Sequence, residues 1–318
     1  MIEHLATYRK WWYLLSIIII LPGLVSLIIN GLDLGIDFTG GTIWEIQFDK
    51  SVSTEEVKNV LAQYGVDDSV VQTSSEDGGT DNVAIIRMEE MATPSELKTQ
   101  LTEALTSQIG PFTELQISTV GSSVSDQVAT RSILAIAVAS LGILAYIAFA
   151  FRNTQRPLHY GAAAIIGMLH DVFLVLGVFS ILGWLFGVQV DALFVTAILT
   201  IIGFSVHDTI VVFDRIRENL ARQSDPTFEG IVNYSLAQTI VRSVNTSLTV
   251  VFTLLALFLF GGESTRTFVL ALLIGVISGT YSSIFNAAQI LVSWHDFRKW
   301  RESRKRCACR RTISVTQF

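Results

Sequence analysis

The stretch DALFVTAILTIIGFSVHDTIVVFDRIREN, residues 191–219, decides the fold of this chain. It is almost continuously apolar up to residue 213, and about 20 such residues are enough to cross a bilayer as a helix. Within it His207 stands next to Asp208. An aspartate inside a membrane span costs several kcal/mol if charged and is a functional-site hypothesis by default. The stretch therefore predicts a membrane helix that carries an ionisable group for a function.

The rest of the chain supports a membrane protein. Half of its residues are hydrophobic and only 16% are charged, against about 25% in soluble domains. Mean hydropathy is +0.51. Because the first apolar run is too long for a signal peptide and lacks a small-residue cleavage site, we expect it to stay in the protein. Apolar windows predict six membrane helices, at 11–30, 130–151, 159–182, 190–213, 243–261 and 266–292.

Basic residues predict the orientation of these helices. Arginines crowd the connections after the second and fourth helices, and the tail 294–318 is strongly basic. By the positive-inside rule, both termini are expected in the cytoplasm of a multi-pass protein of the cytoplasmic (inner) membrane. Residues 31–128 would then be periplasmic or otherwise extracytoplasmic. The predicted domains are 1–30 with the first helix, 31–128 outside, 129–293 with helices two to six, and the tail.

The loop 31–128 is long enough to fold. It holds 17 acidic and 4 basic residues, which we interpret as a solvated surface. Strands are predicted at 44–49, 68–73, 82–88 and 112–120, with a turn at Gly78–Gly79. Helices are predicted after Ser53, whose Glu56 completes a capping box, and after Thr93 with Pro94 at the first helical position. The order βαββαβ predicts an α+β ferredoxin-like domain attached to an α-helical polytopic membrane protein.

Asp208 is the first candidate for chemistry inside the spans. It stands about 10 Å from the membrane edge marked by Arg215, where desolvation favours the neutral carboxylic acid. Arg242 is expected to open the fifth helix from the same side, so the two side chains can lie at similar depth. A switchable Asp208–Arg242 pair would make a proton gate. The alternative is a static ion pair that fixes helix register.

Other polar residues accompany this pair. Asp171, next to His170, lies near the middle of the third helix and either takes part in ion passage or forms interhelical hydrogen bonds. His207 points about 100° away from Asp208, as a relay or as a histidine satisfied at a helix interface. Two polar faces are expected to support the site: Ser205 and Thr209 beside Asp208, and Asn245, Thr246 and Thr249 beside Arg242. A stripe on the last helix is interpreted as packing: Ser278, Ser282, Asn286 and Gln289.

Several chemistries find no support in the sequence. Neither a G-x-x-x-x-G-K-[ST] loop nor a nucleotide-binding fingerprint occurs, so no cofactor is expected. Cys307 and Cys309 form a lone C-x-C in the basic tail, too little for a zinc site. We predict no metal site, no enzymatic activity and no nucleic-acid partner. The tail is expected to anchor the chain at the membrane, where it can contact anionic lipid.

Three segments resemble one family. LGIDFTGGTIWEI (34–46), FSVHDTIVVFDRIREN (204–219) and RSVNTSLT (242–249) are similar to the signature blocks of SecF, within the resistance–nodulation–division superfamily. The resemblance implies half of a pseudo-symmetric twelve-helix assembly with SecD, which uses the ion gradient to promote preprotein translocation through SecYEG. It also implies YajC and YidC as candidate partners, and assigns ion coupling to Asp208 and Arg242.

Two alternatives to this function stay open at the sequence level. One is a small-molecule or lipid exporter of the same superfamily, although such exporters carry twelve spans and two external loops in one chain. The other is a passive subunit whose polar residues only dock a partner. The residues do not distinguish H⁺ from Na⁺ as the coupling ion.

Overall fold

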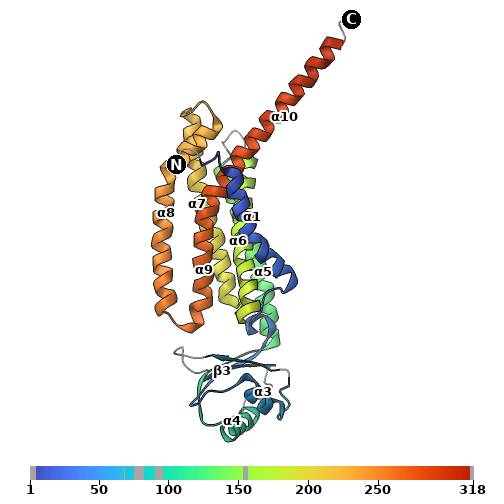
Figure 1. Cartoon of the computed structure of the whole chain (residues 1–318), viewed down its shortest axis with the longest axis vertical. Coiled ribbons are helices and arrows are strands. Elements are labelled where there is room, and N and C mark those ends of the chain that lie inside the picture. Colours follow the sequence, from blue (N-terminus) through green and yellow to red (C-terminus); the bar gives the residue numbers. More distant parts are fainter. Residues whose placement is uncertain (1–4, 68, 75–81, 90–95, 153–156, 316–318) are drawn as a thin grey trace. The chain divides into compact units, whose positions relative to one another are not determined.

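The computed structural model describes residues 5–67, 69–74, 82–89, 96–152 and 157–315. In this part of the chain, six helical segments are long and apolar enough to cross a membrane, which confirms the six predicted spans. The segments are α1 (Arg9–Ile29), α5 (Ser122–Ala150), α6 (Pro157–Phe186), α7 (Ala192–Ala221), α8 (Phe228–Phe260) and the continuous run of α9 (Glu263–Ser282), a π-helical turn (Ser283–Ala287) and α10 (Ala288–Val315), labelled in Figure 1.

Several helices extend beyond their apolar windows, and on the N-terminal side α8 does so by the largest margin. It begins at Phe228 rather than near residue 243, after Thr227 accepts a hydrogen bond from the Gly230 N–H as N-cap. The added turns carry buried polar residues such as Asn233 and Ser235, which hydropathy does not count as helical core. Arg242 therefore lies in the middle of α8 and not at its first residue.

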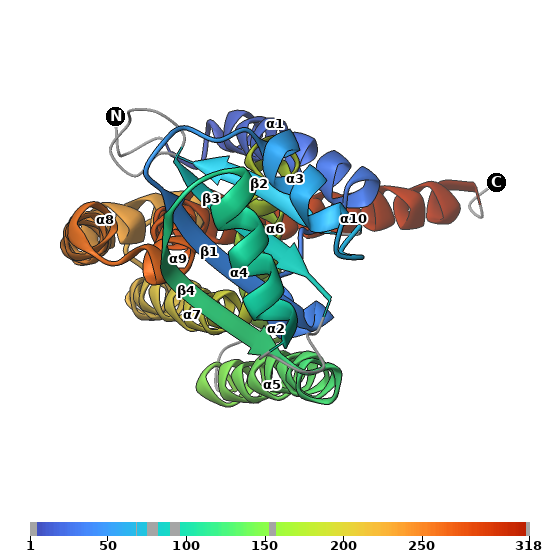
Figure 2. The same cartoon turned by 90° about the horizontal axis from the view of Figure 1, so that it is seen from below.

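The chain divides into two compact units, Leu34–Leu134 and the remainder, Met1–Asp33 with Ala135–Phe318. The smaller unit holds an antiparallel sheet of order β2-β3-β1-β4, formed by β1 (Gly41–Phe48), β2 (Val70–Ser74), β3 (Val83–Met88) and β4 (Phe112–Val120). Helices α3 (Thr54–Ala62) and α4 (Glu96–Gln108) cover one face of it, as Figure 2 shows. This is the predicted ferredoxin-like arrangement.

Local sequence explains much of the smaller unit. The Ser53–Glu56 capping box at the start of α3 is present as predicted. Trp44, Leu61 and Leu101 lie in the core between sheet and helices. The Trp44 indole N–H donates to Glu114, and the hydrogen bond from Lys98 to the same carboxylate lowers the pKa of Glu114. Thr93, Pro94 and the Gly78–Gly79 turn lie outside the described residues.

Two glycines enable the entry into β1. After the short helix α2 (Ile36–Thr39), Gly40 and Gly41 have φ of +74° and +115°, in the region that side chains disfavour. A Cβ on Gly41 would also come within 2.7 Å of the Met88 carbonyl oxygen. Backbone conformation and the close approach of β3 therefore both require glycine at position 41.

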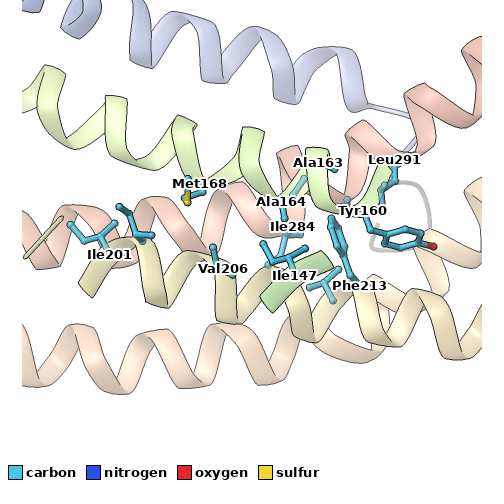
Figure 3. Close-up of a cluster of buried hydrophobic side chains, with 14 of the residues drawn as sticks. Ile147, Tyr160, Ala163, Ala164, Met168, Ile201, Val206, Phe213, Ile284 and Leu291 are labelled. Atoms are coloured by element: carbon cyan, nitrogen blue, oxygen red, sulfur yellow. The ribbon is translucent and has the colours of Figure 1, made fainter. Parts of the chain in front are cut away.

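The larger unit packs around α6, α7 and α9. Phe151, Tyr160 and Phe213 form an aromatic cluster in which Tyr160 stacks on Phe151 with ring centroids 5.4 Å apart. Figure 3 shows Tyr160 and Phe213 near Ile284 of the π-helical turn and Leu291 of α10. Side chains from α6, α7, the π-helical turn and α10 thus meet Phe151, which directly follows α5, in one apolar core.

Helices α1 and α6 cross at a pair of glycines. A Cβ on Gly177 would lie 2.7 Å from the Gly23 Cα, which leaves no room for any side chain. One turn away, the Ser26 and Ser180 hydroxyls are hydrogen-bonded at 2.9 Å. Close approach through small residues, together with an interhelical hydrogen bond, is a common way for membrane helices to associate.

We predict that Gly177→Val separates α1 from α6. Overpacking costs about 1–3 kcal/mol, so the thermal unfolding midpoint of the purified protein should fall. Gly142→Val is the matched control, because a Cβ at Gly142 meets no atom within 4 Å. Equal midpoints for the two variants would contradict the close crossing.

Candidate functional site

Asp171 is fully buried between three helices. The hydroxyls of Ser205 on α7 and of Ser278 and Ser282 on α9 donate to its carboxylate at 2.5–2.6 Å. The Nδ1 atom of the adjacent His170 lies 3.0 Å from Asp171 Oδ1. Four side-chain contacts from α6, α7 and α9 therefore surround one carboxylate, which compensates for the water it has lost.

Asp208 is buried in a second cluster of hydroxyls. It is 8% exposed and accepts hydrogen bonds of 2.6 Å from Ser243 on α8 and from Ser283 on the π-helical turn. Ser205, which bonds Asp171, precedes Asp208 by three residues on the same face of α7. The Asp171 cluster, through Ser205, thus meets α7 about one helical turn from Asp208.

The two clusters are joined at the start of the π-helical turn. Ser282, the last residue of α9, bonds Asp171, and the next residue, Ser283, bonds Asp208. Isolated π-helical turns occur often at functional sites, because an extra residue redirects the side chains that follow. The two carboxylates therefore bond consecutive residues of one backbone segment.

The structure does not bring Arg242 to Asp208. Arg242 is exposed on α8, and among the described residues the Asp208 carboxylate forms no ion pair with it. The neighbouring Ser243 faces Asp208 instead. Since successive helical residues differ in direction by about 100°, a direct pair would require rotation of α8 or of the arginine side chain. The expected similar depth is nevertheless seen, because Ser243 and Arg242 are adjacent.

The remaining predicted residues separate into buried and exposed sets. Ser205 and Thr209 are buried beside Asp208, whereas His207 is exposed. Asn245 and Thr246 are exposed with Arg242, and the Thr246 hydroxyl donates to the Arg242 carbonyl. The face of α8 that carries Arg242 is thus turned away from the carboxylates.

Sequence reasoning missed the partners of both acids. Ser278 and Ser282, interpreted as packing residues, donate to Asp171, and Ser283 was not singled out. The signal available in the sequence was the i, i+4 spacing of Ser278 and Ser282, together with an acid expected to be buried on another helix. In the last turns of α7, Asp214 forms an ion pair with Arg217 at 2.6 Å. Among the described residues, no three His, Cys, Asp or Glu side chains are placed to hold a metal ion.

Comparison with known proteins places this fold and site in one family. The family model "Protein export membrane protein SecD/SecF, C-terminal" matches residues 100–297, and the model "SecD/SecF GG Motif" matches residues 25–52. The protein translocase subunits SecF of Thermobaculum terrenum and Anaerolinea thermophila are 56% and 41% identical to this chain. These alignments cover 91% and 92% of this chain, and 93% and 94% of the relatives.

Longer relatives contain the same segment. The protein translocase subunit SecDF of Bacillus subtilis is 36% identical over 93% of this chain, which spans 38% of that protein. The crystal structure of SecDF from Thermus thermophilus, a translocon-associated membrane protein, superposes with a TM-score of 0.78 at 30% identity. That match covers 92% of this chain and 38% of the other.

The chain belongs to the SecD/SecF family of protein-export membrane proteins. It is a SecF-type subunit of Sec protein export and a multi-pass membrane protein. The resemblance seen in the three sequence blocks is confirmed, as is the prediction of a translocation protein rather than an enzyme.

We predict that the adjacent serines report separately on the two acids. Removing a hydroxyl that donates to a carboxylate disfavours the charged form. Labelling by dicyclohexylcarbodiimide, which attacks protonated carboxyl groups, should therefore rise at Asp208 in Ser283→Ala and at Asp171 in Ser282→Ala. Peptide mass spectrometry measures both sites in each variant. Equal changes at both acids in both variants would contradict the assignment of one serine to each.

Proposed function

We propose that this subunit, with SecD, uses the transmembrane proton gradient to promote preprotein translocation through SecYEG. The observation that carries the proposal is the burial of Asp208 in a cluster of hydroxyls within a membrane helix bundle. A carboxylate there is expensive unless a function retains it. Serine hydroxyls can donate to the charged form and accept from the neutral form, so the cluster can hold either state.

Proton loading at Asp208 would change how α8 packs. In the charged state the carboxylate holds Ser243 of α8 and Ser283 of the π-helical turn. When the Asp208 carboxylate is protonated, one of its two oxygens carries a hydrogen and accepts less well. One of these two contacts is then weakened. Each charge that crosses 100 mV releases about 2.3 kcal/mol, enough to shift a two-state packing equilibrium by more than tenfold. Arg242, adjacent to Ser243, would move with α8 and approach or leave the carboxylate.

The exposed face of α8 is the proposed contact with SecD. Arg242 and Asn245 lie there among exposed apolar side chains, including Val241, Leu248 and Phe252. An arginine exposed to hydrocarbon is costly, so a neighbouring helix should cover it. The SecDF protein of Bacillus subtilis carries its matching segment within a longer chain, which supports a covalent or non-covalent SecD partner. SecYEG, YajC, YidC and preprotein remain proposed partners on family grounds.

The proposed orientation, with cytoplasmic termini and extracytoplasmic residues 31–128, predicts thiol accessibility. Thr106 is exposed on α4, so Thr106→Cys should react with an impermeant maleimide added outside intact cells. The native Cys307 and Cys309, the two cysteines of the chain, should react only after lysis. Labelling of the native cysteines from outside would reverse the orientation.

Asp208→Asn tests the gate directly. It keeps the size and hydrogen bonding of the side chain but removes the titratable proton. Proton flux and stimulation of export by the reconstituted complex should both be lost, while co-purification with SecD stays normal. Asp214→Asn is the matched control: Asp214 is exposed and paired with Arg217, so flux should be nearly unchanged. Full flux in Asp208→Asn would leave only a structural role for this carboxylate.

A further inference from the structure

A groove lies among the membrane helices, between α1, α6, the π-helical turn and α10. Its volume is about 800 Å³, and nearly all of its surface is apolar. Ile17, Leu21 and Ile166 line it and are exposed, so the groove is open along its side. Lipid hydrocarbon is as apolar as these side chains. The groove therefore suits hydrocarbon, either from a lipid or from an apolar helix of a partner.

The length of the groove matches one leaflet of a bilayer. On α1 its lining residues run from Tyr13 to Leu24, a rise of about 16 Å. Beside Leu24, α1 and α6 are in backbone contact, because a Cβ on Gly177 would lie 2.7 Å from the Gly23 Cα. The hydrocarbon core of a bilayer is about 30 Å thick, so a partner's membrane helix crosses about twice the depth of the groove. An acyl chain of a single leaflet has the length that the groove offers.

The outer end of the groove is amphipathic. Here the Tyr13 and Ser293 hydroxyls are hydrogen-bonded at 3.0 Å, and Trp294 and Phe297 complete the lining. Tyrosine and tryptophan concentrate at the level of the lipid headgroups, where their amphipathic rings meet the interface. The Tyr13 end is therefore the end at which an acyl chain would join its headgroup.

Two basic residues flank this outer end. Lys10 precedes Tyr13 by three residues on α1, and Arg301 follows Phe297 by four residues on α10. Residues at these spacings share one face of a helix, so each basic residue continues the face that lines the groove. Both side chains are exposed. A headgroup at the mouth of the groove would thus meet one cation from each helix.

The charges at this end favour an anionic headgroup. The neighbouring Arg9 is paired with Asp296 at 2.7 Å, and this ion pair joins α1 to α10 at the level where the basic residues stand. Residues 297–311 hold eight basic residues and one acidic residue. Basic pockets between membrane helices bind the headgroups of anionic lipids.

We infer that the groove is a binding site for one anionic phospholipid, with an acyl chain between α1 and α10 and the phosphate at Lys10 and Arg301. In the proposed orientation this lipid belongs to the cytoplasmic leaflet. It covers the exposed apolar wall of α1 and ties the first membrane helix to the last. The site is independent of the proposed function, because neither Asp171 nor Asp208 lines the groove.

Native mass spectrometry of the full chain with its partner in mild detergent tests the headgroup. The wild type should bind phosphatidylglycerol about thirtyfold more tightly than phosphatidylcholine with the same acyl chains, since each basic residue near the membrane surface is worth about fivefold. Lys10→Gln with Arg301→Gln should remove this preference. Arg217→Gln with Arg222→Gln, the same loss of charge at the end of α7, should keep it. Equal binding of the two lipids by the wild type, or an equal effect of the two double variants, would overturn the headgroup site.

Filling the groove tests where the acyl chain lies. Ile17 and Ile18 on α1 are each 58% exposed, but only Ile17 lines the groove. Ile17→Trp should weaken phosphatidylglycerol binding about tenfold, as overpacking would, whereas Ile18→Trp should leave it unchanged. Thermal unfolding midpoints check that both variants stay folded. Equal binding by the two variants would show that the chain does not lie in the groove.

Photolabelling distinguishes a site from bulk lipid. In phosphatidylcholine proteoliposomes of the complex, a trace of phosphatidylglycerol with a diazirine at the end of one acyl chain should label α1 near Leu21 and Leu24. Unlabelled phosphatidylglycerol should suppress the labelling, and the same amount of extra phosphatidylcholine should not. Equal suppression by both lipids means contact with bulk lipid only, and no labelling of α1 is expected if a partner helix fills the groove. Either result overturns the lipid site.

Discussion

Hydrogen bonding of buried carboxylates is the constraint on which the helix bundle depends. Asp171 has no exposed surface, so every hydrogen bond that water would have formed must come from protein. Serine hydroxyls from α7 and α9 donate to this carboxylate of α6, which fixes the rotation of α7 and α9 relative to α6. Apolar packing alone would allow several rotations at similar energy, since lipid and leucine are equally apolar. The polar cluster selects one.

The two acids bond different sets of side chains. Asp171 contacts His170 of α6, whereas Asp208 contacts Ser243 of α8. Between them stand Ser282 and Ser283, consecutive residues at the point where α9 becomes π-helical. A row of polar contacts therefore runs through the apolar bundle from His170 to Ser243. Such a row is costly to maintain, and a merely structural subunit could satisfy helix packing with fewer ionisable groups.

Sequence predicted the framework better than the contacts. Hydropathy windows located six spans, because most residues of a membrane helix are apolar and the hydropathy averaged over about 20 residues is therefore high. The Ser53–Glu56 box was predictable for the opposite reason, since all its atoms lie within four residues. The start of α8 was missed, because its first turns carry polar residues such as Asn233 that are buried against protein rather than lipid.

The partner of Asp208 could not be read from sequence, and the reason is geometrical. Hydropathy and charge single out Arg242 because a charged residue is rare in an apolar span. The rotation of α8 about its axis, however, decides whether Arg242 or the adjacent Ser243 faces Asp208, and in the structure it is Ser243. That rotation is set by contacts spread over α7, α8 and α9, including the Ser247–Thr280 hydrogen bond. A charge pattern alone cannot choose between two adjacent residues. Under the proposed function, bringing the Arg242 guanidinium to Asp208 in place of the Ser243 hydroxyl would take a rotation of α8 of up to about 100°, or a smaller rotation together with a change of the arginine rotamer.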